Sequence, residues 1–270
     1  MMRGASADSL ATLGEDLSAA VDGGADAARV GDDLFAVSAI LRTEAGLRRV
    51  VTDVSLVSDA KSELVRQLLA DQLEGASLDL VAKAVTLRWA ASLDLGAALE
   101  QLGVVAVVKG ADNADQADVL EDELFGFGQL VSENPGLRDA LSDPARSTGD
   151  KRELLRNLLG GNASAATIRL AEQAVAGTHR TVNVAVNEYK LVAAEVHSQR
   201  VATVRVARDL TEQDQQRLAD VLENKYGRKV HLNVLVDPEV VGGIRVEIGD
   251  DVIDGTVASR IDDARRHLAG

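Results

Sequence analysis

Two stretches of this chain align without a gap at an offset of 90 residues: DLFAVSAILRTEAGLRRVVTDVSLVSDAKSELVRQLL at 33–69 and ELFGFGQLVSENPGLRDALSDPARSTGDKRELLRNLL at 123–159. Twelve of the 37 aligned positions are identical. Leucine-rich helices give scattered matches by chance, but not GLR, a shared Asp and K-x-E-L-x-R-x-LL in one register. The alignment therefore indicates an internal duplication, with copies at about 5–95 and 96–185. The identical pairs are Leu34/Leu124, Phe35/Phe125, Gly46/Gly136, Leu47/Leu137, Arg48/Arg138, Asp53/Asp143, Lys61/Lys151, Glu63/Glu153, Leu64/Leu154, Arg66/Arg156, Leu68/Leu158 and Leu69/Leu159.

Each copy has the apolar spacing of a small helical bundle. In the second copy, apolar residues three or four apart predict a helix over 115–131 with one buried stripe. Pro135 ends this helix, because the residue before a proline avoids the α conformation. Ser147 or Thr148 is expected to cap a later helix, and Gly160-Gly161 to end it with a left-handed turn. Further helices are predicted at 137–141, 150–159, where Leu158 is expected to be buried, and 165–176.

The hydrophobic period changes near residue 200. Residues 182–200 predict a long helix with one apolar seam, which suits a connection between two domains. Apolar residues then alternate with polar ones, which predicts strands. The predicted fold is mainly α with a small C-terminal α/β module: a helical bundle at 1–95, a second bundle with its connecting helix at 96–200, and a few-stranded domain at 201–270. Strands are predicted at 201–206, 230–236 and 244–248, with Val252-Ile253 pairing next, and helices from Thr211, with Asp214 as its capping-box partner, and from Val257 to Leu268.

Composition excludes several classes of partner and chemistry. The net charge of −14 disfavours nucleic acid and anionic bilayers, and it is compatible with a basic protein partner. The absence of cysteine excludes disulfides and thiolate chemistry. The first ten residues have no apolar core of a secretory signal, and the longest apolar run, Leu102–Val108, is too short to cross a bilayer. The chain is expected to be soluble and cytoplasmic.

The sequence offers no catalytic, cofactor-binding or metal-ligating residues to nominate. It has neither a phosphate-binding G-x-x-x-x-G-K-[ST] loop nor a G-x-G-x-x-G pattern. Gly126-Phe127-Gly128 is interpreted as close helix packing, and Gly242-Gly243 as a bend before a strand. Asp250, Asp251 and Asp254 are interpreted as a solvated turn, because the spacing of a calcium loop is missing. The four histidines, His179, His197, His231 and His267, lack zinc-helix spacing.

Two segments resemble the delta subunit of F-type ATP synthases, the bacterial counterpart of the mitochondrial oligomycin-sensitivity-conferring protein. KVHLNVLVDPEVVGGIRVEIGDDVIDGTVASRID at 229–262 is similar to the C-terminal signature of that family, an Asp, apolar residues, Gly-Gly, a short strand and I-D-G-[ST]-V. ENPGLRDALSDPARSTGDKRELLRNLL at 133–159 is similar to its N-terminal helical domain. The resemblance covers about 96–270. The common form has a single N-terminal bundle, so residues 5–95 are a departure.

The resemblance implies a non-catalytic stator subunit in ATP synthesis and hydrogen ion transport. Its partners would be the N-terminal helices of the alpha subunits, at the crown of the catalytic head, and the b subunit of the peripheral stalk. No cofactor, small-molecule ligand or direct membrane insertion is implied, and the complex would hold the chain at the cytoplasmic face of the cell membrane. Two alternatives remain open from the residues alone: a free-standing helical adaptor or chaperone-like module, and an enzyme that uses a carboxylate pair in a pocket.

Overall fold

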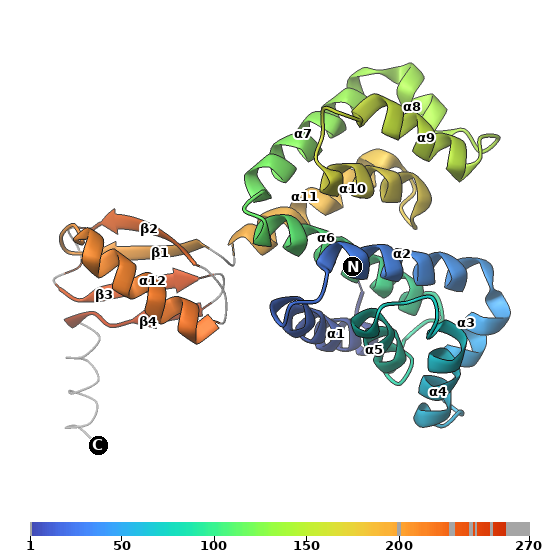
Figure 1. Ribbon diagram of the computed structural model, residues 1–270, viewed down its shortest axis with the longest axis horizontal. Coiled ribbons are helices and arrows are strands. Elements are labelled where there is room, and N and C mark those ends of the chain that lie inside the picture. The colour runs from blue at the N-terminus through green and yellow to red at the C-terminus, as the bar shows by residue number, and fades with distance from the viewer. Residues whose placement is uncertain are drawn as a thin grey trace. The chain divides into compact units, whose positions relative to one another are not determined.

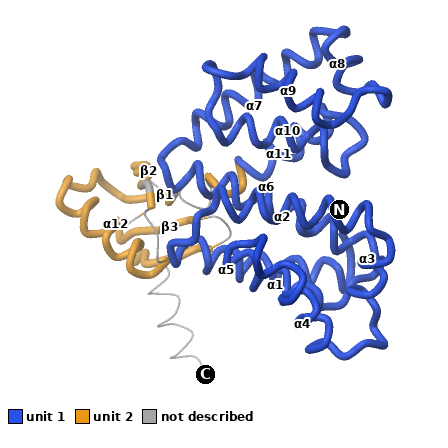
Figure 2. Tube along the Cα trace, turned by 45° about the vertical axis from the view of Figure 1, so that its right-hand side comes forward, with its two compact units in different colours: residues 1–193 blue, residues 194–270 orange. Residues whose placement is uncertain are grey.

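The structure is a computed structural model that describes residues 2–198, 201–226, 230–237, 240, 242–248 and 251–257. The chain divides into two compact units, Met1–Ala193 and Ala194–Gly270 (Figure 2). The first unit is helical, and the second combines a sheet with a helix (Figure 1). This is the predicted fold class, a mainly α chain with a small C-terminal α/β module.

Eleven of the described helices begin in the first unit, and their bounds show the duplication directly. α2, α3 and α4 have counterparts in α7, α8 and α9 whose first and last residues lie 90 positions further along the chain. The helices are α1 (Ala5–Asp22), α2 (Ala27–Thr43), α3 (Ala45–Thr52), α4 (Ser58–Leu69), α5 (Gly75–Ala84), α6 (Asp94–Asn113), α7 (Ala117–Glu133), α8 (Pro135–Ser142), α9 (Thr148–Leu159), α10 (Ala165–Ala176) and α11 (Val182–Ser198).

Helix α6 belongs to both copies. It occupies the position of α1 in the second copy, and it packs against α7 and α10 there. It also packs against α1 and α2 and contributes Leu95, Leu99 and Leu102 to the core of the first bundle. The first bundle is therefore α1–α6 and the second α6–α11, so the two copies share a helix instead of meeting at a linker.

Local signals set the helix boundaries where the sequence predicted them. α7 ends at Glu133, and Pro135 is the first residue of α8. The Ser147 hydroxyl accepts from the backbone N–H of Asp150 and caps α9. Gly161 adopts a φ of 79° after α9, the left-handed exit that a glycine permits.

The second unit is a four-stranded mixed sheet in the order β2-β1-β3-β4. β1 is parallel to β2, which follows the helix α12 in the chain, and antiparallel to β3, which in turn pairs antiparallel with β4. α12 packs its Leu222 against Ala202, Val204 and Val206, so the face of β1 that the alternation predicted to be apolar is the buried one. The elements are β1 (Val201–Val206), α12 (Glu212–Tyr226), β2 (His231–Val236), β3 (Ile244–Ile248) and β4 (Asp251–Asp254).

Other sequence predictions have mixed outcomes. Thr211 caps α12, since its hydroxyl accepts from the Asp214 N–H at 3.2 Å and donates to the Asp214 carboxylate at 2.7 Å. Leu158, expected to be buried, is 38% exposed, because the buried face of α9 is formed by Leu155 and Leu159. The predicted final helix lies beyond residue 257, outside the described residues. The division into three domains stays a prediction.

The difference between Leu155 and Leu158 gives a matched test of this packing. Leu155 is fully buried, so Leu155→Asp places an unpaired charge in the core and should lower the free energy of unfolding by at least about 3 kcal/mol. Leu158→Asp should cost less than about 1 kcal/mol. Urea unfolding followed by circular dichroism measures both changes, and equal losses would contradict the described orientation of α9.

Candidate partner-binding surfaces

Gly243, the second glycine of the C-terminal signature, lets two segments beside the sheet approach closely. Gly243 has a φ of 86°, and a Cβ there would overlap the Gly255 carbonyl oxygen and lie 2.8 Å from the Thr256 Cα. Two backbone hydrogen bonds of 2.9 Å flank this approach, from the Gly255 N–H to the Ile244 carbonyl and from the Val257 N–H to the Gly242 carbonyl. The segment before β3 is thus clasped to the segment after β4, which confirms the predicted bend.

The acidic residue of the same signature closes a turn. The Asp254 carboxylate accepts from the hydroxyl of Thr256 at 2.7 Å and from its N–H at 2.9 Å. Both hydrogen bonds lower the pKa of Asp254 below its ordinary value, and the one from the Thr256 hydroxyl contributes most. Asp251 accepts instead from the Tyr226 hydroxyl at 3.2 Å, and Asp250 lies outside the described residues. The I-D-G-[ST]-V pattern is therefore explained by backbone geometry in this module.

The sheet face opposite α12 carries ion-paired side chains beside two exposed apolar residues, Leu235 and Val252. Arg205 of β1 lies 3.7 Å from the Asp237 carboxylate and 3.9 Å from that of Glu247 on β3. Glu247 also accepts from the Arg245 guanidinium at 2.9 Å. This face, unlike the one beneath α12, presents ion-pairing side chains of the kind that suit a charged partner.

Two of the identical pairs, Arg48/Arg138 and Asp53/Asp143, make equivalent hydrogen bonds in the two bundles. Arg48 donates to the Leu41 and Arg42 carbonyls at the end of α2, and Arg138 donates to the Ser132 carbonyl at the end of α7. The side chains of Asp53 and Asp143 each accept a backbone N–H two residues on at 2.8 Å. The GLR and Asp of the repeat motif therefore tie helix ends and turns, and their recurrence is explained by the fold.

An acidic side chain of each copy caps a later helix. Asp33 on α2 accepts from the Glu74 N–H at 2.9 Å, before α5, and Glu123 on α7 accepts from the Ser164 N–H at 2.9 Å, before α10. Glu123 also accepts from the Thr167 hydroxyl at 2.6 Å. Burial acts to raise the pKa of Glu123, but the hydrogen bonds from Thr167 and Ser164 outweigh it, and the pKa is lowered.

The carboxylates singled out by their surroundings, within the described residues, are engaged in local structure. Asp139 and Asp143 line an open depression on α8, where Asp143 is engaged in its own turn. Buried Glu100 on α6 accepts from the Thr178 N–H at 2.9 and 3.1 Å, beside Tyr189. Burial and then the Glu100 charge raise the pKa of Tyr189. Across the described residues, no three histidine or acidic side chains are grouped so as to hold a metal ion.

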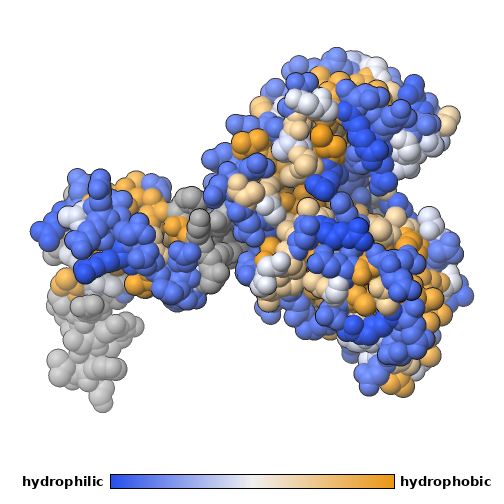
Figure 3. Space-filling view, in the orientation of Figure 1, coloured by the Kyte–Doolittle hydropathy of each residue, from blue (hydrophilic) through white to orange (hydrophobic). Residues whose placement is uncertain are grey.

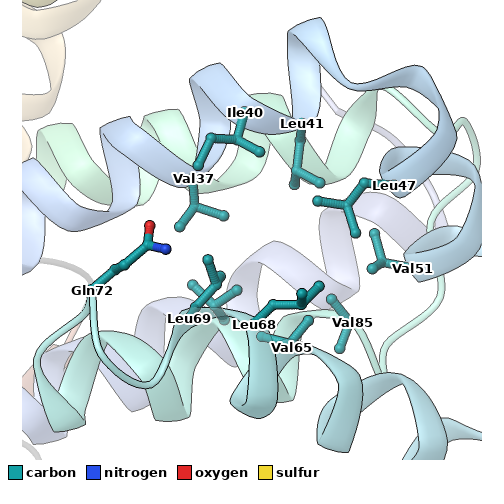
Figure 4. A pocket seen from close by; sticks show the side chains of 11 residues that line it. Val37, Ile40, Leu41, Leu47, Val51, Val65, Leu68, Leu69, Gln72 and Val85 are labelled. Carbon is teal, nitrogen blue, oxygen red and sulfur yellow. The ribbon is translucent and has the colours of Figure 1, made fainter.

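Two surface features were missed by the sequence analysis. The first is an apolar cavity of about 210 Å³ between α2, α3, α4 and α5 of the first bundle (Figure 4). The second is Phe125 on α7, which is 51% exposed and has the Lys190 ammonium 4.6 Å from its ring centroid. The sequence reveals neither feature, because the cavity-lining residues and Phe125 all have the spacing of ordinary helical core residues. The prediction of close helix packing at Gly126-Phe127-Gly128 is wrong for the glycines: a Cβ at Gly126 would meet nothing within 4 Å, and one at Gly128 would make only an ordinary contact with Val186 at 3.4 Å. The buried residue of the three is Phe127.

Among the described helices, none combines the length and apolarity that crossing a membrane requires. The architecture, two helical bundles on a shared helix followed by a small sheet whose glycines serve its folding, defines a scaffold class of protein with surfaces for partners.

Comparison with known proteins assigns the scaffold to a family. Residues 104–268 match the family model described as the ATP synthase delta (OSCP) subunit. The chain is 55% identical to the ATP synthase subunit delta of a Nocardioides species, over all of this chain and 98% of that protein. It is 44% identical to that of Kineococcus radiotolerans, over 92% and 90% of the two chains, and 43% identical to that of Streptomyces coelicolor, over 99% and 98%. The chain belongs to the ATP synthase delta (OSCP) subunit family.

The lowered pKa of Glu123 predicts a pH-dependent contribution to stability. In acid the unfolded chain takes up this proton before the folded chain does, so the contribution is present above the ordinary glutamate value of 4.5 and is lost as pH falls through the folded pKa. Wild type should be more stable than Glu123→Gln at pH 7, and the gap should close below pH 4.5. Urea unfolding across pH measures it. In a Thr167→Val background the gap should be smaller, and a gap independent of pH would contradict the assignment.

The clasp at Gly243 predicts a large effect of a side chain there. Gly243→Val should destabilise the second unit by at least about 2 kcal/mol, because φ is positive and Cβ overlaps the Gly255 carbonyl. Gly242→Ala should cost less than about 1 kcal/mol, since its Cβ meets only the Val257 side chain, at 3.3 Å. Hydrogen exchange of the β3 amides reports the local stability, and wild-type protection in Gly243→Val would show the clasp to be dispensable.

Proposed function

We propose that this chain is a non-catalytic subunit of the peripheral stalk of a proton-translocating ATP synthase. It links the catalytic head to the b-subunit stalk, so that rotation is coupled to proton flow. The observation that carries the proposal is similarity over essentially the whole chain to proteins named ATP synthase subunit delta. The free-standing adaptor is not favoured, because these relatives match both bundles as well as the C-terminal unit.

The family model supports a division of labour between the parts of the chain. It begins at residue 104, within α6, and therefore covers most of the second bundle and the C-terminal unit. We assign the second bundle to the N-terminal helices of the alpha subunits, and the C-terminal unit to the b subunit. Apolar side chains exposed on α7 and α11 are available to a helix that packs against the second bundle: Val119, Phe125, Val184 and Leu191.

The mechanical requirement explains a protein with surfaces in place of an active site. A stator contact must hold the head against the torque of the rotor, so it must dissociate slowly. A nanomolar contact corresponds to about −12 kcal/mol, and contacts made by one chain at two places strengthen one another. The chain would lie at the cytoplasmic face of the cell membrane, held there by its partners, because a net charge of −14 gives it no attraction to anionic lipid.

Binding of the alpha-subunit helix tests this assignment. A synthetic peptide of the alpha-subunit N-terminus from the same organism should bind the full chain with a dissociation constant of about 1 μM or below, as measured by isothermal titration calorimetry. Phe125→Asp should weaken binding at least about tenfold, because it removes an exposed aromatic ring from the proposed contact. Phe35→Asp is no suitable control, since Phe35 is buried, and Val221→Asp on α12 serves instead.

Loss of the chain should separate ATP hydrolysis from proton flow. Membranes stripped of it should lose ATP-driven proton pumping, while the released catalytic head continues to hydrolyse ATP. Addition of the full chain should restore pumping. Membranes that pump normally without the chain would refute the proposed role, whatever the outcome with the peptide.

A further inference from the structure

One face of the first bundle already carries a helix from outside that bundle. α10 of the second bundle packs against α6 and α2, which lie side by side in the first bundle. At this contact the Arg169 guanidinium donates to the Asp32 carboxylate of α2 at 3.1 Å. Phe35, one helical turn from Asp32, is buried. The face formed by α2 and α6 is therefore covered in part by α10, with an arginine bound to an aspartate.

The counterpart of this face in the second bundle is formed by α7 and α11 and is exposed. Asp122 occupies the position of Asp32, and its carboxylate has no ion pair or hydrogen bond within the part of the chain that the structure describes. Phe125 occupies the position of Phe35 and is 51% exposed. Hydrophobic side chains are visible among hydrophilic ones over the second bundle (Figures 1 and 3). We call the surface around Asp122, Phe125 and Lys190 the α7–α11 face.

Lys190 gives the α7–α11 face a direction. It occupies the position of Glu100 on α6, whose carboxylate accepts from the Thr178 N–H just beyond the C-terminal end of α10. The C-terminal end of a helix seated like α10 would therefore come to Lys190, and a cation stabilises the free carbonyl groups at such an end. The Lys190 ammonium lies 4.6 Å from the ring centroid of Phe125, so the cation and the ring belong to one surface.

The local charge decides what kind of helix fits this surface. α7 and α11 together carry seven aspartates and glutamates against one lysine, Lys190. An arginine in the position of Arg169 would therefore find a carboxylate in need of a cation. A second copy of the chain is disfavoured, because its first bundle has Asp79 in the position of Arg169, and Asp79 is already paired with Arg66 at 2.7 Å. The occupant is thus a helix of another protein, with an arginine about two turns before its C-terminal end.

We propose that the α7–α11 face is the docking site of a partner helix that packs as α10 packs on α2, with an arginine bound to Asp122 and its C-terminal end at Lys190. This docking site rests on the proposed function, which assigns an alpha-subunit helix to the second bundle, and it adds the contacts that orient that helix. α11 then takes the part of α6, so the partner helix extends the stacking that already joins the two bundles.

A matched pair of aspartate variants tests the site with the alpha-subunit peptide and the full chain. Asp122→Asn should weaken peptide binding at least about fivefold in isothermal titration calorimetry, because the arginine loses its anionic partner. Asp32→Asn makes the same change at the covered face of the first bundle and should alter binding less than about twofold. Equal effects of the two variants, or no effect of Asp122→Asn, would overturn the proposal.

Substitutions in the peptide identify the arginine. When each arginine is changed to glutamine in turn, one change should weaken binding to wild type at least about fivefold but binding to Asp122→Asn less than about twofold, because the two groups act on each other. Lys190→Met should weaken binding of the unchanged peptide about two- to fivefold, since it removes a cation from the helix end. Unchanged or tighter binding by Lys190→Met would contradict the proposed direction of the helix.

The outcomes distinguish failure of this docking site from failure of the proposed function. A peptide that binds wild type, with no arginine that couples to Asp122, would leave the alpha-subunit contact standing and overturn the docking geometry. A peptide that does not bind wild type would overturn the alpha-subunit assignment and the docking site with it. A wild-type chain that sediments as a dimer and becomes monomeric on Asp122→Asn would assign the α7–α11 face to a second copy and overturn the proposed occupant.

Discussion

Both helical bundles depend on helix α6, which packs against α1 and α2 in the first bundle and against α7 and α10 in the second. Fourteen of its twenty residues are buried, including Glu100, Lys109 and Asp112. A helix that serves one core needs one apolar stripe, but α6 closes the first bundle and opens the second, so it must be apolar around most of its circumference. This explains the run Leu102–Val108, the longest apolar run of the chain. This apolar run is too short to cross a bilayer, and it lies in the part of α6 that is buried between the two cores.

The close crossing of α2 and α6 shows how small residues permit this arrangement. A Cβ at Gly103 would lie 2.6 Å from the ring of Phe35, so only glycine allows that ring to pack against α6. At the equivalent position α11 has Ala193, which is buried. Phe125, the counterpart of Phe35, is instead half exposed, with the Lys190 ammonium over its ring. The same phenylalanine is thus a core residue in one copy and a surface residue in the other.

The sequence predicts element types well because the relevant signals are local. Pro135, Ser147 and Gly161 act on their own neighbours, and the boundaries around them follow. The gapless repeat also predicts equivalent contacts, such as those of Arg48 and Arg138. The helix shared by the two copies was missed, because an alignment divides a chain into consecutive segments and cannot show that one segment packs in two cores.

Side-chain environments were harder to predict, because they depend on volumes summed over several helices. Leu155 and Leu158 both fit an apolar stripe, and only the position of α10 decides which is buried. The hydrophobic periodicity marks both Val37 and Phe127 as core residues. It does not show that the smaller Val37 lines a cavity, because the volume of that cavity depends on many side chains together. The candidate surfaces therefore could not be predicted from the sequence pattern. The glycine clasp could, because it depends on one residue.

Duplication has preserved the contacts that the fold requires and has left surface residues free to change. Contacts that close a helix end, such as those of Asp33 and Glu123, recur in both copies because each bundle needs them to fold. Surface residues have no such requirement, so one copy can carry Leu56 where the other carries Arg146. A stator subunit gains from this freedom, because a second bundle on the same rigid helix adds a contact surface without altering the first. Additional contacts on one chain slow its release under load, since all of them must open before the chain dissociates.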